Sequence, residues 1–122
     1  GKPSPDMNKL KPLLPILNKL IQKDYKESEI EILIDSCWAI SYLSDGSNKY
    51  IDYVLNEFDL NRLISLIKHK DIKVQTPVVR IIGNIASGND NQTEKILSLG
   101  ILEHLKDLLI HDKSSIRKEA CW

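Results

Sequence analysis

The sequence predicts an all-α solenoid, and the first observation behind this prediction is a repeated sequence pattern. Trp38 and Trp122 each follow a cysteine, and they lie 84 residues apart, which is twice 42. Arg80 occupies the midpoint between them. Apolar positions recur at the same interval, for example Leu60 and Leu102. A period of this length is typical of arrays that stack one helical unit on the next.

The spacing of apolar residues within the unit predicts three helices and no strands. In the complete unit we expect helices over residues 49–57, 59–69 and about 74–87, with Asp59 as the N-cap of the second. Pro77 should lie in the first turn of the third helix, where its missing N–H costs little. No stretch alternates apolar and polar residues as a half-buried strand does. The helical pattern recurs over residues 91–99, 101–111 and 114–122.

The front of the chain deviates from this pattern. We expect residues 1–8 to form a connector, followed by helices over about 10–23 and 28–44. The first of these helices is either entered at Pro12 or kinked near Pro15. Both are expected to belong to a unit that lacks its first helix.

The expected domain organisation is one repeat domain over residues 1–122. Residues 9–46 form the incomplete first repeat, 47–88 a complete repeat and 89–122 a truncated one. About four additional residues around Tyr25 should form an insertion at the outer rim, since solenoids tolerate insertions in loops. The last helix is expected to be cut short, so we expect a fragment of a longer array whose exposed ends promote self-association.

Composition excludes several classes of function. The 17 basic and 17 acidic residues give a formal net charge of zero, which argues against broad binding to nucleic acid. No apolar run is long enough to span a membrane. The three histidines are not spaced as a metal set, and no phosphate-binding loop or catalytic triad pattern is present, so we expect no cofactor, no metal and no enzyme activity. Cys37 and Cys121 should be reduced, because equivalent positions two repeats apart are too far apart for a disulfide.

Functional residues are expected on one face of each third helix, because positions three, four and seven apart share a face. Each tryptophan has a carboxylate three residues before it on this face. In order along the chain, the face holds Asp35, Trp38, Tyr42, Asp45, then Pro77, Arg80, Asn84, Ser87, then Glu119 and Trp122.

This set of side chains suits an extended basic peptide. An Asn amide can hold a peptide backbone whatever the side chains are. Trp rings form slots for the stems of Lys or Arg, and acidic residues select positive charge. A Trp on a helix is more often a core residue, but a charged residue at the middle position of the series argues against a core. Asn84 could instead bridge neighbouring repeats, and Asp90 could serve only as a turn residue.

Three segments closely resemble the importin-α (karyopherin-α) family. They are Ser36 to Gly46, Pro77 to Thr93 and Ile116 to Trp122, and the resemblance extends over essentially the whole chain. It implies an armadillo-repeat right-handed superhelical solenoid of about two and a half repeats of three helices, from about the fifth repeat to part of the seventh. The insertion around Tyr25 is not part of the family pattern.

The resemblance also implies a function. Importin-α proteins carry cargo with Lys/Arg-rich nuclear localisation signals between cytoplasm and nucleus, with importin-β and an export receptor binding through regions absent here. By this resemblance, Ser87 and Asp90 match positions that line the family's peptide-binding groove. Tyr42 stands where the family's repeated motif of Trp followed four positions later by Asn has its Asn. The candidate peptide-binding residues are therefore Asp35, Trp38, Tyr42, Asp45, Arg80, Asn84, Ser87, Asp90, Glu119 and Trp122.

Two alternatives remain at this stage. A generic armadillo scaffold would bind folded partners through its surface, independently of the third-helix face. An enzyme using Asp35 and Asp45 as paired carboxylates is disfavoured, because ten positions along one helix place them about 15 Å apart.

Overall fold

The computed structural model describes residues 7–107 and 109, and every regular element in this part of the chain is helical. Residues 101–107 are also helical. The remaining elements are α1 (Met7–Leu10), η1 (Lys11–Leu13), α2 (Leu14–Gln22), η2 (Glu27–Glu29), α3 (Ile30–Ser44), α4 (Asn48–Glu57), α5 (Leu60–Ser65), η3 (Leu66–Lys68), α6 (Ile72–Ala86) and α7 (Asp90–Ser98), where η denotes a 3-10 helix.

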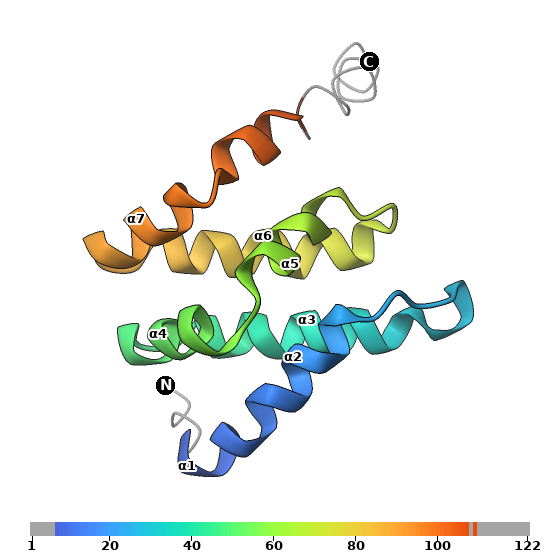
Figure 1. Ribbon diagram of the computed structural model, residues 1–122, viewed down its shortest axis with the longest axis horizontal. Coiled ribbons are helices and arrows are strands. Elements are labelled where there is room, and N and C mark those ends of the chain that lie inside the picture. Colours follow the sequence, from blue (N-terminus) through green and yellow to red (C-terminus); the bar gives the residue numbers. More distant parts are fainter. Residues whose placement is uncertain (1–6, 108, 110–122) are drawn as a thin grey trace, which may run out of the picture.

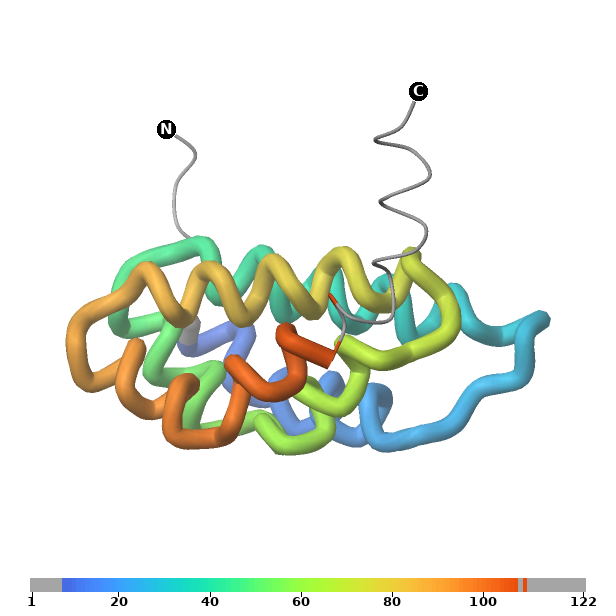
Figure 2. Tube along the Cα trace, turned by 90° about the horizontal axis from the view of Figure 1, so that it is seen from above, coloured from blue at the N-terminus to red at the C-terminus, as the bar shows by residue number. Residues whose placement is uncertain are grey.

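The helices stack as repeated layers of a solenoid. The two long helices, α3 and α6, run side by side, and α2 and α5 cross them at an angle (Figure 1). Seen from above, α3 and α6 form one layer, while α2, α5 and residues 101–107 form the other (Figure 2). This arrangement confirms the predicted all-α solenoid, and the stretch from Asn48 to Ala86 holds α4, then α5 with η3, then the long helix α6.

The core explains why apolar residues recur at the repeat interval. Ile40 on α3 and Ile82 on α6 are both buried, and so are Val54 on α4 and Ile96 on α7. Burying one such side chain stabilises the fold by about 1.5–3 kcal/mol. Each repeat therefore contributes equivalent residues to one continuous core.

The repeated glycines have a steric explanation. A Cβ atom at Gly46 would collide with the ring of Tyr50, and a Cβ atom at Gly88 would collide with the amide of Gln92. Tyr50 and Gln92 themselves lie one repeat apart. The turn after each long helix thus requires Gly, because the side chain four residues later occupies the space.

Hydrogen bonds across repeats fix how neighbouring units stack. Arg62 on α5 donates from Nε to the carbonyl oxygen of Ile21 at the end of α2, at 2.7 Å. The buried Gln92 on α7 donates to the carbonyl of Asn48 and to Oδ1 of Asp52, both at 2.8 Å. Polar contacts as well as the apolar core therefore join consecutive repeats.

Several predicted boundaries need correction. Helix α1 begins at Met7, inside the stretch 1–8 that was predicted as a connector. The helix predicted over 10–23 is divided by the 3-10 turn η1, which contains Pro12, and α2 begins with Pro15 in its first turn. The helix predicted over 59–69 likewise divides into α5 and η3.

Pro77 was predicted in the first turn of the third helix, and this was wrong. Asp71 caps α6 by accepting from the backbone N–H of Lys73 at 2.9 Å, so the helix begins at Ile72 and Pro77 lies inside it. The missing N–H removes one helical hydrogen bond at this point.

No described helix is long and apolar enough to cross a membrane.

Candidate functional site

The predicted functional face of α3 lies at the surface and is rich in aromatic area. Tyr42 is 72% exposed, and Trp38 is half-buried with part of its ring packed against the core. Their ring centroids are 6.1 Å apart with planes tilted by 31°. A core residue would leave little ring area in contact with solvent, whereas this pair forms an anchored aromatic surface that a long side chain could cover.

Two carboxylates flank the aromatic pair along α3. Asp35 and Asp45 are both exposed, and neither forms an ion pair with any described residue. Asp45 ends the helix, where the helix dipole disfavours negative charge by about 0.3–1 kcal/mol. Its placement is therefore not explained by helix stability, and both carboxylates remain available to a cation.

The corresponding face of α6 differs in charge. Arg80 is exposed, and its guanidinium has no hydrogen bond or ion pair within the described residues. Ser87 ends the helix and donates its hydroxyl hydrogen to the carbonyl of Gly83 at 2.8 Å. Asp90 is the first residue of α7, where the helix dipole favours a carboxylate, so its position also has a local structural explanation.

Asn84 bridges the two long helices. Its amide nitrogen donates to Oγ of Ser44 at 3.0 Å and to the carbonyl oxygen of Ser41 at 3.3 Å, and both serines lie on α3. The carbonyl of Ser41 can only accept, and the hydroxyl of Ser44 already donates to that same carbonyl at 2.8 Å. Both partners therefore require a donor, which fixes the amide orientation.

The fixed amide changes what Asn84 can offer to a ligand. Both hydrogens of the NH₂ group are used between the repeats, and only the oxygen Oδ1 remains. The bridging role that the sequence left open is thus present, and it restricts Asn84 to accepting from a peptide N–H. Sequence reasoning missed Ser41 and Ser44, although two serines three positions apart on an otherwise apolar helix face are a detectable signal.

Glu119 and Trp122, the last two predicted site residues, lie outside the described residues. Among the described residues the structure thus brings together an aromatic pair, two unpaired carboxylates, one unpaired guanidinium and one oriented amide. The aromatic pair and the carboxylates lie on α3, and the guanidinium and the amide lie on α6.

The described residues offer no reactive thiol and no metal site. Cys37 is fully buried on α3, and burial raises its pKa to about 12, with a smaller opposing effect from the positive charge of Arg62. A thiol with so high a pKa stays protonated and unreactive at neutral pH. No group of three or more His, Cys, Asp or Glu side chains in this part of the chain could hold a metal ion.

The fold is that of armadillo-repeat proteins. The armadillo/beta-catenin-like repeat family matches residues 89–122. Among solved structures, an engineered protein matches 88% of this chain and 43% of its own, with a TM-score of 0.72 and 32% identity. A designed armadillo repeat protein in complex with the peptide (KR)4 matches 84% of this chain and 42% of its own, with a TM-score of 0.74 and 32% identity.

Comparison with curated proteins narrows the family further. The chain is 44% identical over its whole length to importin subunit alpha-3 of Arabidopsis thaliana and 46% identical to importin subunit alpha-7 of the same plant. It is 50% identical to importin subunit alpha-B of Dictyostelium discoideum over 73% of its length. The chain is therefore an armadillo-repeat protein of the importin-α family, and it spans 22% of the length of the two Arabidopsis relatives.

Proposed function

We propose that the exposed face of α3 and α6 binds Lys/Arg-rich nuclear localisation signals in an extended conformation. The observation that carries this proposal is the aromatic pair of Trp38 and Tyr42 between two exposed, unpaired carboxylates. Aromatic rings cover the aliphatic stem of Lys or Arg, and carboxylates attract its charged end. A related designed armadillo protein was solved with a peptide of alternating Lys and Arg, which supports the same ligand chemistry.

The two helices are proposed to contact different parts of the peptide. Asp35, Trp38, Tyr42 and Asp45 form a slot for basic side chains. Asn84 accepts a hydrogen bond from the peptide backbone, because only its oxygen is available. Arg80 repels a basic residue placed beside it, so the peptide should carry a neutral or acidic residue there.

Ser87, Asp90, Glu119 and Trp122 are proposed to extend this surface. Ser87 at the end of α6 and Asp90 at the start of α7 are both exposed, and Glu119 with Trp122 repeats the sequence spacing of Asp35 with Trp38. Several weak contacts used together would give the affinity that no single slot provides.

At the level of the cell, we propose a nuclear import adaptor that shuttles between cytoplasm and nucleus. The identity to importin subunits alpha over the whole chain supports this role. Importin-β and an export receptor would bind through parts of the longer relatives that this chain does not cover. Such an adaptor requires binding and release of cargo and no chemical reaction.

The test is a calorimetric titration of the full chain with a Lys/Arg-rich signal peptide and with a charge-matched scramble of it. We expect tighter binding of the signal peptide and a loss of that preference in Trp38→Ala. Equal affinity for both peptides would contradict recognition of individual basic side chains along the face of α3 and α6. Binding of a folded partner that persists in Trp38→Ala would favour the alternative of a generic scaffold.

A further inference from the structure

A second concave site lies at the opposite end of the long helices from Asp45. It is a cavity of about 450 Å³, within the range of about 300–1,000 Å³ typical of ligand sites. Its lining comes from two consecutive repeats. One wall holds Tyr25, Glu27 and Ile30, and the other holds His69, Lys70, Asp71 and Ile72.

The insertion that departs from the family pattern builds one of these walls. Tyr25 and Glu27 belong to the segment between α2 and α3, which carries about four more residues than the corresponding segment before α6. Tyr25 is held in place because its hydroxyl donates to the carbonyl of Leu20 at 2.7 Å. The insertion thus lines a cavity that the sequence did not indicate.

The second wall is held by hydrogen bonds of its own. The backbone N–H of Asp71 donates to Nδ1 of His69 at 3.0 Å, and Gln75 donates from its amide to the carbonyl of His69. Since Nδ1 accepts, the neutral His69 ring carries its hydrogen on Nε2. Tyr25 in one wall and His69 in the other are therefore held in place by hydrogen bonds within the chain, which reduces the entropy that these two side chains lose on binding.

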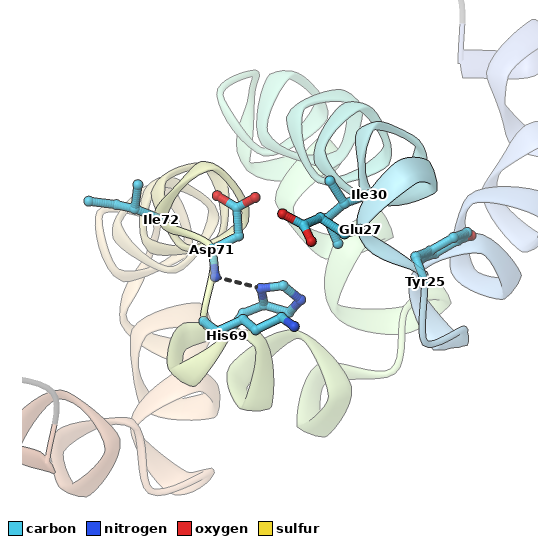
Figure 3. A pocket seen from close by; sticks show the side chains of 7 residues that line it. Tyr25, Glu27, Ile30, His69, Asp71 and Ile72 are labelled. Carbon is cyan, nitrogen blue, oxygen red and sulfur yellow. Dashed lines mark hydrogen bonds between the residues drawn. The ribbon is translucent and has the colours of Figure 1, made fainter.

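The cavity combines apolar surface with an excess of negative charge. Ile72 is 69% exposed at the cavity, and Ile30 is half-buried beside it. The carboxylates of Glu27 and Asp71 point toward one another from opposite sides, with the His69 ring beneath them (Figure 3). Lys70 supplies one positive charge against these two carboxylates.

The carboxylates retain capacity for a ligand. Glu27 makes no hydrogen bond or ion pair with any described residue. Oδ1 of Asp71 accepts from Lys73, and Oδ2 has no partner in the same part of the chain. The N-terminal end of α6 carries partial positive charge, and the Asp71 carboxylate already neutralises it, so this helix end should not attract an anion.

We propose that this cavity, formed between two repeats, binds the side chain of a Lys or Arg from a polypeptide partner. The aliphatic stem packs against Ile30 and Ile72, and the charged end lies between Glu27 and Asp71. Ile30 precedes Trp38 by eight positions, which is about 12 Å along α3. The cavity is thus a separate site, and the proposal does not depend on peptide binding at the third-helix face.

The test is an NMR titration of the full chain with N-acetyl-arginine N-methylamide, a neutral-backbone probe with one positive charge. The methyl groups of Ile30 and Ile72 and the ring of His69 report binding at the cavity. We expect saturable shifts with an affinity on the order of millimolar, because one charged contact contributes little by itself. N-acetyl-glutamine and N-acetyl-glutamate N-methylamides are the neutral and negative controls.

Matched variants separate charge from fold. Glu27→Gln and Asp71→Asn each remove one charge, and Asn is as good an N-cap as Asp. Each variant should weaken arginine binding about threefold or more, and the double variant should abolish the shifts. Glu31→Gln, an exposed neighbour that does not line the cavity, should leave them unchanged.

Each remaining outcome is decisive. Equal shifts with the glutamine probe, stronger shifts with the glutamate probe, or arginine shifts that survive in the double variant would each overturn the proposal. The indole signal of Trp38 reports the third-helix face in the same spectra when a basic peptide is added. A response at Trp38 without one at the cavity would overturn only the cavity proposal, and the reverse would overturn only the proposed function.

Discussion

The two long helices α3 and α6 occupy equivalent places in consecutive repeats, but they differ on two sides. One side is the candidate peptide-binding face, and the other, called the stacking face, holds Cys37 in α3 and Val79 in α6. On the candidate peptide-binding face, α3 carries two aromatic rings and two carboxylates, while α6 carries a guanidinium and an amide. On the stacking face, Cys37 of α3 is fully buried, while its counterpart Val79 on α6 is 41% exposed. Equivalent backbone units therefore carry an aromatic and acidic surface in one repeat and a positive charge in the next.

The comparison of Cys37 with Val79 indicates that the place of a repeat in the array decides how deeply an apolar side chain is buried. The comparison of Trp38 with Arg80 indicates that the residue type at one exposed position decides which ligand chemistry the surface suits. Cys37 is fully buried on α3, which packs against α6. Val79, at the matching position of α6, remains in contact with solvent. Trp38 and Arg80, by contrast, differ in chemistry at matching positions of the same face.

The largest expected effect concerns the stacking face and the pH dependence of stability. Burial raises the pKa of Cys37 from 9.0 to about 12, so the folded chain keeps this thiol protonated while the unfolded chain ionises it above pH 9. Stability from this group is intact below pH 9 and falls by about 1.4 kcal/mol per pH unit as the pH rises toward 12. Between pH 9 and 11 the loss should be roughly 2 to 3 kcal/mol.

Denaturant unfolding of the parent chain and of Cys37→Ala at several alkaline pH values measures this effect. Other groups also titrate in this range, so the informative quantity is the difference in pH slope between the two proteins. The variant should show the shallower slope. Identical slopes would mean that the thiol is not shielded from solvent in the folded chain.

The second prediction removes the aromatic slot. Trp38→Ala should weaken binding of a Lys/Arg-rich peptide by about 2 kcal/mol, or about 30-fold, because packing on the stem and cation–π attraction are lost together. Isothermal titration calorimetry measures the change. Tyr42→Phe keeps the neighbouring ring and is the control, with an expected change of less than threefold. A similar loss of affinity in both variants would mean that the Trp38 ring has no specific role in binding the peptide.

The repeat period, the helical class and the exposure of Asp35, Tyr42, Asp45, Arg80 and Ser87 could be predicted from the sequence, because they depend on spacing within one unit. Pro77, expected on the same face, is buried, so that expectation was wrong. The exact start of α6 could not be predicted, because it depends on which polar residue caps the helix, and the cap is Asp71, which places Pro77 in the helix interior.

Features made by contacts between units could not be predicted either. The direction of the Asn84 amide depends on Ser44, 40 residues earlier in the chain. The cavity exists only because the insertion near Tyr25 faces the loop before α6.

The third prediction reverses the charge at Arg80, which occupies in α6 the position that Trp38 occupies in α3. Arg80→Glu should strengthen binding of an uninterrupted basic peptide by about tenfold, because an exposed repulsive contact becomes attractive. Fluorescence anisotropy at increasing salt measures both the gain and its screening. Arg80→Gln removes the charge without reversing it and should give an intermediate gain. Unchanged affinity in Arg80→Glu would place the peptide away from this residue.

The smallest expected effect tests how Asn84 is held. Ser44→Ala removes one of the two acceptors for the Asn84 amide, so one N–H is released and the side chain can rotate. Peptide affinity should fall about threefold to fivefold, since a typical neutral hydrogen bond contributes about 1 kcal/mol and the oxygen is no longer oriented. A peptide with one backbone amide replaced by an ester, which lacks the N–H, should lose affinity in the parent chain at one position only. In Ser44→Ala this positional preference should disappear, because the freed N–H can also donate to a peptide carbonyl. If the ester replacement is harmless at every position in the parent chain, Asn84 does not accept from the peptide, and its amide serves only to join the two repeats.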